Sequence, residues 1–382
     1  MVDYLIFLAV QTAIYSLFSL GLNLQWGFTG LINFGHVAFL TLGAYTTVLL
    51  SFKGVPLLLS LLIGAILAAL LGLIIGFSTL RLREDYLGIV TIGVGELIRL
   101  VVNNQDLPST ENWATWQSGS FGLQSYRIPL SNLAPNLLLK LVMIGLLTLV
   151  AGLTIFWLWR WIRAAQPPRL ADAPKIRGSK EEFTLRLVVG ITLALLSVAI
   201  YISGVIGLYN YNPKAGLMLL SVIVLALIFW RLEVLVRSPW GRVLKAIRED
   251  EEIPLALGKN VFWYKLQSFM LGGAIAGVAG ALYAWQQSSV YPNDFEPQTT
   301  FNAWIMVILG GSGNNIGTIL GAVIFSAYDA LTREYLDDIF PQLTTEQSGA
   351  FRIMVIGLIL MVLMVSRPQG ILGKKEELTL GK

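Results

Sequence analysis

The sequence predicts an all-α protein, a polytopic bundle of transmembrane helices with about ten membrane segments. Of its 382 residues, 55% are hydrophobic and only 13% are charged, whereas soluble domains carry about 25% charged residues. Apolar runs of roughly 20 residues, long enough to cross a bilayer as helices, recur along the whole chain. There is no cysteine, which excludes disulfides and thiolate metal sites.

The apolar segments are separated by polar connections. They lie near 4–25, 28–51, 56–80, 86–103, 135–160, 185–208, 214–236, 265–289, 300–335 and 350–367. The first has no basic region before it and no small-residue cleavage site, so we interpret it as a retained span and not as a signal peptide. The ninth contains the helix-breaking run Gly310-Gly-Ser-Gly-Asn-Asn-Ile-Gly317, so we divide it into a limb at 300–311 and a return helix at 316–335.

Basic residues concentrate in four of the polar stretches. These are Arg81 with Arg83, the stretch 160–186, the stretch 237–265 and the C-terminal tail. The positive-inside rule places all four in the cytosol, so the C-terminus is expected to be cytosolic. The connections 104–134, 209–213, 290–299 and 336–349 then face outward, and we place Met1 on the outer side as well.

Small residues recur at every fourth position in three segments, a spacing that lets membrane helices pack closely. They are Gly64, Ala68, Gly72 and Gly76; Gly273 and Gly277; and Gly313, Gly317 and Gly321. We favour packing within the chain over a subunit interface as the reason for this spacing. No inverted repeat is visible, which argues against a secondary transporter.

The polar stretch from Ser238 to Gly258 carries the start and stop signals of two short helices. Ser238 can cap the first helix, with Pro239 at its first position. Asp250 can cap the second, Pro254 falls in that helix's first turn, and Gly258 is a left-handed stop. The charge pattern puts this stretch in the cytosol, so we predict a structured docking element there.

His36 is the only histidine, and Asn33 precedes it by three residues. The two side chains would share one face of a continuous helix, although Gly30 and Gly35 favour a break in that helix. One interpretation is a hydrogen bond buried between helices. The other is a polar lining to a substrate path, because ionisable groups at membrane depth often mark such paths.

Glu96 and Arg99 are spaced i,i+3 inside an apolar segment, so they can pair on one helix face. Burying Glu96 unpaired would be costly, and pairing with Arg99 is the interpretation that we favour over direct contact with a substrate. Glu96 nevertheless joins Asn33 and His36 as a candidate for the substrate path.

Several motifs are absent from the sequence. There is no G-x-x-x-x-G-K-[ST], so the chain has no P-loop of its own for ATP. There is also no H-E-x-x-H, and one histidine without cysteine cannot build the usual zinc or Cys–His sites. We therefore expect no bound cofactor, no metal and no enzymatic activity in this chain.

Five stretches match one family in its order along the chain. They are Gly30–Tyr45, Leu80–Leu100, 237–265, Met306–Gly321 and Arg367–Gly373. With them the chain resembles the permease subunit of bacterial ABC importers for branched-chain and other neutral amino acids, the Leu/Ile/Val type. The resemblance implies a single permease domain over 1–382 with a type II importer-like bundle, in the bacterial cytoplasmic (inner) membrane.

The resemblance also implies partners. These are a second homologous permease, two cytosolic ATP-binding subunits that use ATP, an external substrate-binding protein and membrane lipid, with no nucleic acid. By analogy 237–265 is the cytosolic coupling loop. The positions that would contact the ATPases are Arg242, Lys245, Ala246, Arg248, Glu249, Asp250, Glu251, Pro254, Ala256 and Gly258.

The chain departs from shorter family members, which run from an outer Gly-rich loop almost directly to the span before the coupling loop. Residues of roughly 135–212 look like an inserted pair of spans joined by a basic cytosolic linker. A solvated tether is the favoured interpretation of that linker, and extra contact with an ATPase or anionic lipid is the alternative.

Alternative functions remain open on the sequence. The same permease role could serve urea or short amides. A channel or ion-coupled carrier that needs no ATPase would leave the doubly capped cytosolic stretch unexplained, and a membrane enzyme lacks a catalytic set.

Overall fold

A computed structural model describes residues 2–81, 84–109, 113–130, 136–163, 180–210, 212–340, 342 and 344–373. Among these residues, nine helices are long and apolar enough to cross a membrane. This confirms the predicted all-α, multi-pass bundle. Most of the linker at 160–186, Arg83 and the tail from Lys374 onward lie outside the described residues, so their predicted roles are not addressed.

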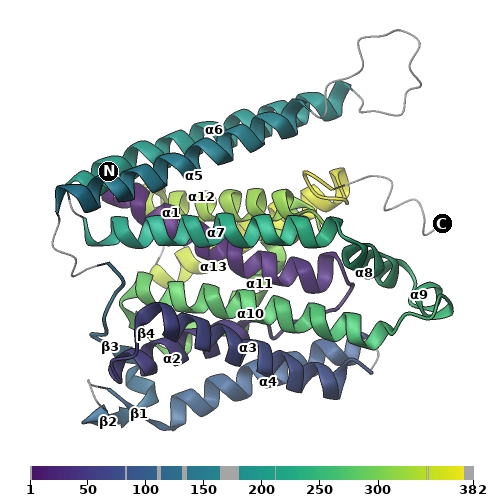
Figure 1. Cartoon of the computed structure of the whole chain (residues 1–382), viewed down its shortest axis with the longest axis horizontal. Helices are drawn as coiled ribbons and strands as arrows, with labels where there is room; N and C mark the ends of the chain where they lie inside the picture. Colours follow the sequence, from purple (N-terminus) through teal and green to yellow (C-terminus); the bar gives the residue numbers. More distant parts are fainter. Residues whose placement is uncertain are drawn as a thin grey trace. The chain divides into compact units, whose positions relative to one another are not determined.

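The chain divides into two compact units. The first consists of the residues up to Val10 together with Leu130–Ala226. It contains α5 (Leu137–Arg163), α6 (Lys180–Tyr209), the start of α1 (Val2–Leu22) and the first half of α7 (Pro213–Arg237). The helices α5 and α6 run side by side (Figure 1). The predicted inserted pair of spans, 135–212, falls within this unit.

Side-chain contacts tie the elements of the first unit together. Lys140 Nζ donates to the Tyr209 carbonyl at 2.7 Å, which joins the start of α5 to the end of α6. Thr148 Oγ1 and Tyr201 OH lie 3.1 Å apart along the same pair. Asn212 Nδ2 donates to the Asp3 carboxylate at 2.6 Å, so the connection before α7 is fixed to the first turn of α1.

The second unit consists of Gln11–Pro129 and Leu227–Lys382. Its long helices are α2 (Val37–Phe52), α3 (Leu57–Thr79), α4 (Glu84–Asn104), α10 (Val261–Gln287), α11 (Pro297–Gly310), α12 (Asn315–Ile339) and α13 (Thr345–Ser366). Two short helices, α8 (Pro239–Glu249) and α9 (Glu252–Ala256), follow α7.

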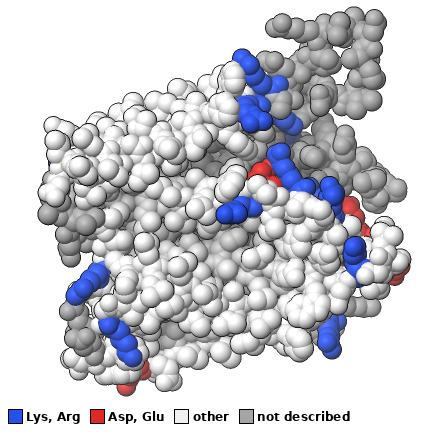
Figure 2. Space-filling view, viewed as in Figure 1, with Lys and Arg blue, Asp and Glu red and all other residues white. Residues whose placement is uncertain are grey.

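Short strands and 3₁₀ turns complete the second unit. The strands pair antiparallel, β1 (Asp106–Pro108) with β2 (Trp116–Ser118) and β3 (Leu123–Gln124) with β4 (Ser289–Val290), beside the turns η3 (Gly119–Phe121) and η4 (Pro292–Phe295). The strands lie at one end of the unit's helices, and α8 and α9 lie at the other (Figure 1). Charged side chains gather toward these two ends and leave a wide uncharged band between them (Figure 2), as a membrane-spanning body requires.

The centre of the second unit is a close-packed group of three helices, α2, α3 and α10. A Cβ on Gly43 of α2 would lie only 2.0 Å from the Gly277 carbonyl oxygen of α10. Ala68 of α3 faces the same glycine, and Phe269 of α10 is fully buried nearby. The small-residue spacing therefore serves packing within the chain, as predicted.

Two of the expected spans are interrupted. The α1 helix continues as a π-helix, η1 (Asn23–Gly27), and the chain is then irregular until α2 begins at Val37. The prediction of an apolar span from residue 28 is therefore wrong for its first nine residues: 28–36 is not helical. The predicted break at 310–317 is confirmed, because α11 ends at Gly310 and α12 begins at Asn315.

The packing of α2 on α10 gives the first prediction. Gly43→Ala should lower the melting temperature of the detergent-purified protein by about 5 °C or more, because the added methyl group meets backbone that cannot move aside. Gly145→Ala in α5 is the control, since a Cβ there has open space around it. Equal melting temperatures for the two variants would contradict this packing.

Candidate functional site: the α8–α9 hairpin and the helix breaks

The first short helix, α8, is amphipathic. Gly241, Leu244 and Ile247 are buried against the rest of the second unit, and the opposite side of the helix is exposed. Pro239 occupies the first turn as predicted, and Ser238 has the extended backbone of a cap. The predicted capping by its side chain is wrong, however, because Ser238 Oγ donates to the Leu235 carbonyl at 2.6 Å and so faces back along α7.

The second short helix, α9, ends at its predicted stop but begins one residue later than predicted, because Glu251 and not Asp250 is its cap residue. Asp250 Oδ1 accepts the Glu252 N–H at 2.8 Å, so this carboxylate binds the helix start, although the helix itself begins two residues later. Pro254 lies in the single turn, and Gly258 ends it with a φ of +74°. The Glu251 carboxylate pairs with Lys265 Nζ of α10, which fixes the hairpin to the bundle.

The tip of the hairpin exposes apolar side chains that the sequence interpretation did not single out. Ile253, Leu255 and Leu257 are 55%, 62% and 75% exposed. They surround the predicted contact positions Pro254 and Ala256. The sequence did hold a signal for them: large aliphatic residues in a stretch that the charge pattern assigns to water. Exposed apolar groups rimmed by acids are typical of a protein contact.

Arg248 joins the hairpin to the interior of the second unit. Its Nη1 donates to the Gly27 carbonyl, the end of the π-helix, at 2.5 Å, and its Nη2 donates to Glu249 at 2.8 Å. The side chain is only 18% exposed. A Cβ on Gly313 would lie 2.7 Å from Nη1, and one on Gly30 would lie 3.4 Å from the Arg248 Cγ. The guanidinium therefore sits between the two interrupted helices.

Asparagine side chains connect the two breaks. Asn23 Oδ1 accepts the Gly313 N–H at 2.9 Å, and Asn23 Nδ2 donates to Asn315 Oδ1 at 3.2 Å. Asn315 in turn donates to the Glu233 carboxylate of α7 at 3.2 Å. Asn314 caps α12 by accepting the N–H groups of the next helical turn. The Gly313 N–H and the first N–H groups of α12 are thus paired with amide side chains.

The predicted path residues Asn33 and His36 belong to a buried network on the irregular segment 28–36. Asn33 Nδ2 donates to Gln25 Oε1 at 2.8 Å and lies 3.4 Å from His36 Nδ1. Gln25 Nε2 donates to the Phe269 carbonyl at 2.9 Å. Since the Phe18 carbonyl, 3.1 Å from His36 Nε2, can only accept, Nε2 carries the proton and Nδ1 accepts from Asn33.

Asn33 and His36 come together in a different way from the one that the sequence predicted. Asn33 and His36 are adjacent because the irregular chain folds them together, and they do not share a helix face. Both side chains are fully buried within the chain. This gives them a structural role as hydrogen-bonding partners. Their role in a substrate path stays a prediction.

Glu96 pairs with Arg99 as predicted, through hydrogen bonds of 2.9 Å from Nε and 2.5 Å from Nη2. Arg99 Nη1 also reaches Asn293 Oδ1 at 3.4 Å. The helix α4 contacts the irregular segment elsewhere, where Thr91 Oγ1 accepts the Phe34 N–H at 3.1 Å. In the part of the chain that the structure describes, no hydrogen bond joins the Glu96 pair to Asn33 or His36, and no three His, Asp or Glu side chains gather as a metal site would need.

Comparisons with known proteins give one family. The model of the permease component of branched-chain amino acid transport systems matches residues 4–364. The chain is 29% identical to the high-affinity branched-chain amino acid transport system permease protein LivM of Escherichia coli over 96% of this chain and 69% of that protein. It is 23% identical to the probable LivM of Methanocaldococcus jannaschii over 99% and 96% of the two chains.

A second type of permease is also similar. The permease protein LivH of the same kind of transport system in Salmonella typhimurium is 24% identical over 95% of this chain and 92% of that protein. No solved structure matches the chain.

The buried network gives the next prediction. Asn33→Leu removes the donor to Gln25 and the acceptor of the Gly35 N–H, which lies 3.0 Å from Asn33 Oδ1. Each buried group left unpaired costs about 1–3 kcal/mol, so the purified protein should unfold at a clearly lower temperature. Asn104→Leu, at an exposed position, should leave the melting temperature unchanged. A wild-type melting temperature for Asn33→Leu would show that the network does not support the fold.

Proposed function

We propose that this chain, which belongs to the family of permease components of branched-chain amino acid transport systems, is the membrane subunit of an ATP-driven importer. The importer takes up branched-chain or other neutral amino acids that an external binding protein delivers. The observation that carries the proposal is the α8–α9 hairpin. Its apolar tip is exposed, and Arg248 joins the helix pair to the breaks of two membrane helices. Import as the direction follows from the family alone.

The proposed partners follow from the family and from the hairpin. LivM and LivH of Salmonella typhimurium are two different permease proteins of this kind of transport system, and both resemble this chain. A second permease subunit is therefore the natural partner. Because no P-loop is present, ATP is used by two separate cytosolic subunits, each of which receives a hairpin like α8–α9. This chain itself binds no cofactor.

The charge pattern supports the orientation of the chain. The hairpin end of the second unit carries Arg242, Lys245 and Arg248, and basic residues mark cytosolic ends. The C-terminal tail is basic as well. We place the hairpin and the C-terminus in the cytosol and the short strands on the outer side of the cytoplasmic membrane.

The geometry suggests how ATP-driven movement reaches the membrane. The ATPase grips the apolar tip at Ile253, Leu255 and Leu257, where burying each side chain contributes about 1.5–3 kcal/mol. A push on α9 moves α8 with it. Arg248 passes the displacement to the Gly27 carbonyl and hence to η1. The η1 helix carries Gln25, so the Asn33–His36 network moves as well.

Replacement at the tip tests the docking step. Leu255→Glu places a charge in the apolar contact, so co-purification with the ATPase and leucine uptake in cells should both fall at least tenfold. Lys259→Gln, just beyond the hairpin, is the control and should keep both. Unchanged leucine uptake with Leu255→Glu would favour a carrier or channel that needs no ATPase. Full uptake of urea but not of leucine by the wild-type complex would instead change the substrate class.

Replacement of Arg248 tests the transmission step separately. Arg248 faces inward, so Arg248→Gln should still co-purify with the ATPase while leucine uptake falls at least tenfold. The lost charged hydrogen bond to the Gly27 carbonyl is the physical reason. Lys259→Gln again serves as the control. Loss of ATPase binding together with uptake would mean that Arg248 belongs to the docking surface and not to the transmission route.

A further inference from the structure

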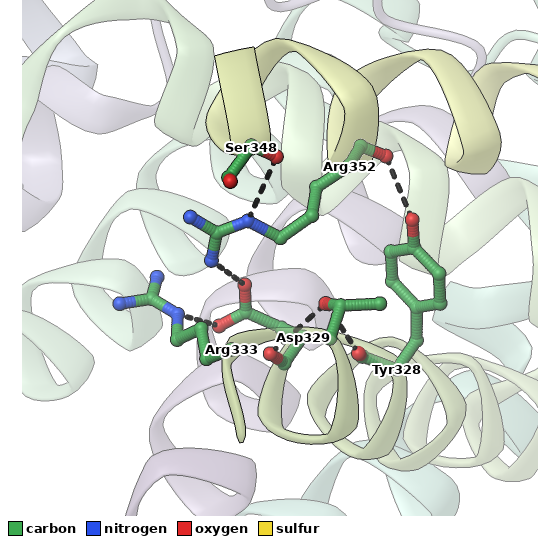
Figure 3. Close-up of polar contacts among 6 residues, drawn as sticks. Tyr328, Asp329, Arg333, Ser348 and Arg352 are labelled. Carbon is green, nitrogen blue, oxygen red and sulfur yellow. Dashed lines mark hydrogen bonds and ion pairs between the residues drawn. The ribbon is translucent and has the colours of Figure 1, made fainter. Parts of the chain in front are cut away.

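A cluster of charged side chains joins α12 to α13 away from the hairpin (Figure 3). Asp329 and Arg333 lie on α12, and Arg352 lies on α13, all within helices apolar enough to span a membrane. Charged groups inside membrane spans are costly and usually mark a binding or transport role. The proposed docking and transmission route does not use these three residues.

The ion pair between Asp329 and Arg352 is open. Asp329 Oδ2 accepts from Arg333 Nε at 3.0 Å, whereas Asp329 Oδ1 lies 4.0 Å from Arg352 Nη1. A distance of 4.0 Å allows electrostatic attraction but is too long for a hydrogen bond. One carboxylate oxygen and one guanidinium edge therefore face each other without direct contact (Figure 3).

Other contacts hold Arg352 in place. Its Nε donates to the Ser348 carbonyl at 3.4 Å, and its own carbonyl accepts from Tyr328 OH at 2.8 Å (Figure 3). Among the described residues, its two terminal nitrogens make no hydrogen bond. A guanidinium carries five N–H donors, and the Arg352 side chain is 24% exposed. The donors of Arg352 are thus positioned and available.

The surroundings of the cluster are polar and incompletely paired. Tyr15 of α1 packs against Phe325 of α12 with ring centroids 5.9 Å apart. Ser326 Oγ, one turn before Asp329, is buried and has no hydrogen-bond partner in the described part of the chain. Buried hydroxyl groups without partners require an explanation such as a ligand.

We propose that Asp329 and Arg352 form a subsite for the α-ammonium and α-carboxylate groups of the transported amino acid. The inference rests on the proposed function and adds to it a recognition site in the permease itself. The terminal N–H groups of Arg352 bind the substrate carboxylate, because a guanidinium can donate two parallel hydrogen bonds to a carboxylate. Asp329 Oδ1 binds the ammonium. The zwitterion lies alongside the pair, with its ammonium group on Asp329 and its carboxylate on Arg352.

The arrangement favours a zwitterion over a simple anion such as a lipid phosphate. A phosphate has acceptors only, and the Asp329 carboxylate beside Arg352 would repel it. An α-amino acid carries donor and acceptor one carbon apart, which suits a carboxylate and a guanidinium that face each other. Such a site recognises the part that all α-amino acids share, so it accepts the substrate without selecting its side chain.

The test uses the whole complex, with both permeases, the ATPases and the binding protein, reconstituted in liposomes without anionic lipid. Arg352→Gln should raise the KM for leucine uptake or lower the uptake rate at least tenfold, while the melting temperature stays unchanged. Arg352→Lys keeps the charge but loses the fork, so it should recover only part of the uptake. Glu334→Gln, on the exposed side of α12, is the matched control and should behave as wild type.

The possible results distinguish a substrate subsite from other roles of Arg352 and from a failure of the proposed function. If the wild-type complex transports leucine and Arg352→Gln transports it equally well, only the proposed subsite is overturned. If the wild-type complex transports no leucine, the proposed function is overturned. If the melting temperature of Arg352→Gln falls together with its uptake, Arg352 serves to hold α12 and α13 together. Wild-type uptake that appears only when anionic lipid is added, with Arg352→Gln indifferent to the lipid, would show a phosphate site. Either of these results would overturn the inference.

Discussion

The hydrogen bond from Arg248 to the Gly27 carbonyl connects the hairpin to the membrane helices, and the rest of the site depends on it. A helix end leaves its last carbonyl groups without partners inside the helix, so the end of η1 offers an acceptor. Arg248 reaches it from α8 through space that Gly30 and Gly313 leave open. The α8–α9 hairpin is in this way bonded directly to backbone inside the bundle.

The helix breaks explain why this apolar chain buries so many amides. Interrupted helices release N–H and C=O groups that lipid cannot satisfy. Asn23, Gln25 and Asn33 pair with those groups or with one another, and Asn314 closes the start of α12. Each amide offers both donors and acceptors, so a few of them can satisfy two breaks at once.

Different interactions hold the three-helix centre of the second unit and its two helix breaks. The helices α2, α3 and α10 meet at glycines with backbone almost in contact, an arrangement that tolerates little change. The breaks after η1 and α11 are held by side-chain hydrogen bonds, which can exchange partners at lower cost. A push from the hairpin would therefore act on the breaks, while the three-helix centre keeps its shape.

The sequence by itself determined the membrane bundle, the break at 310–317, the Glu96–Arg99 pair and the two short helices before Gly258. Each depends on neighbours along the chain: an apolar run, a glycine cluster, an i,i+3 spacing, a proline or glycine signal. Only the tertiary structure decided that Arg248 faces inward to Gly27 and that Asp329 faces Arg352 across an open gap. These contacts join residues far apart in the chain. Their partners are set by how helices pack, which local spacing does not encode.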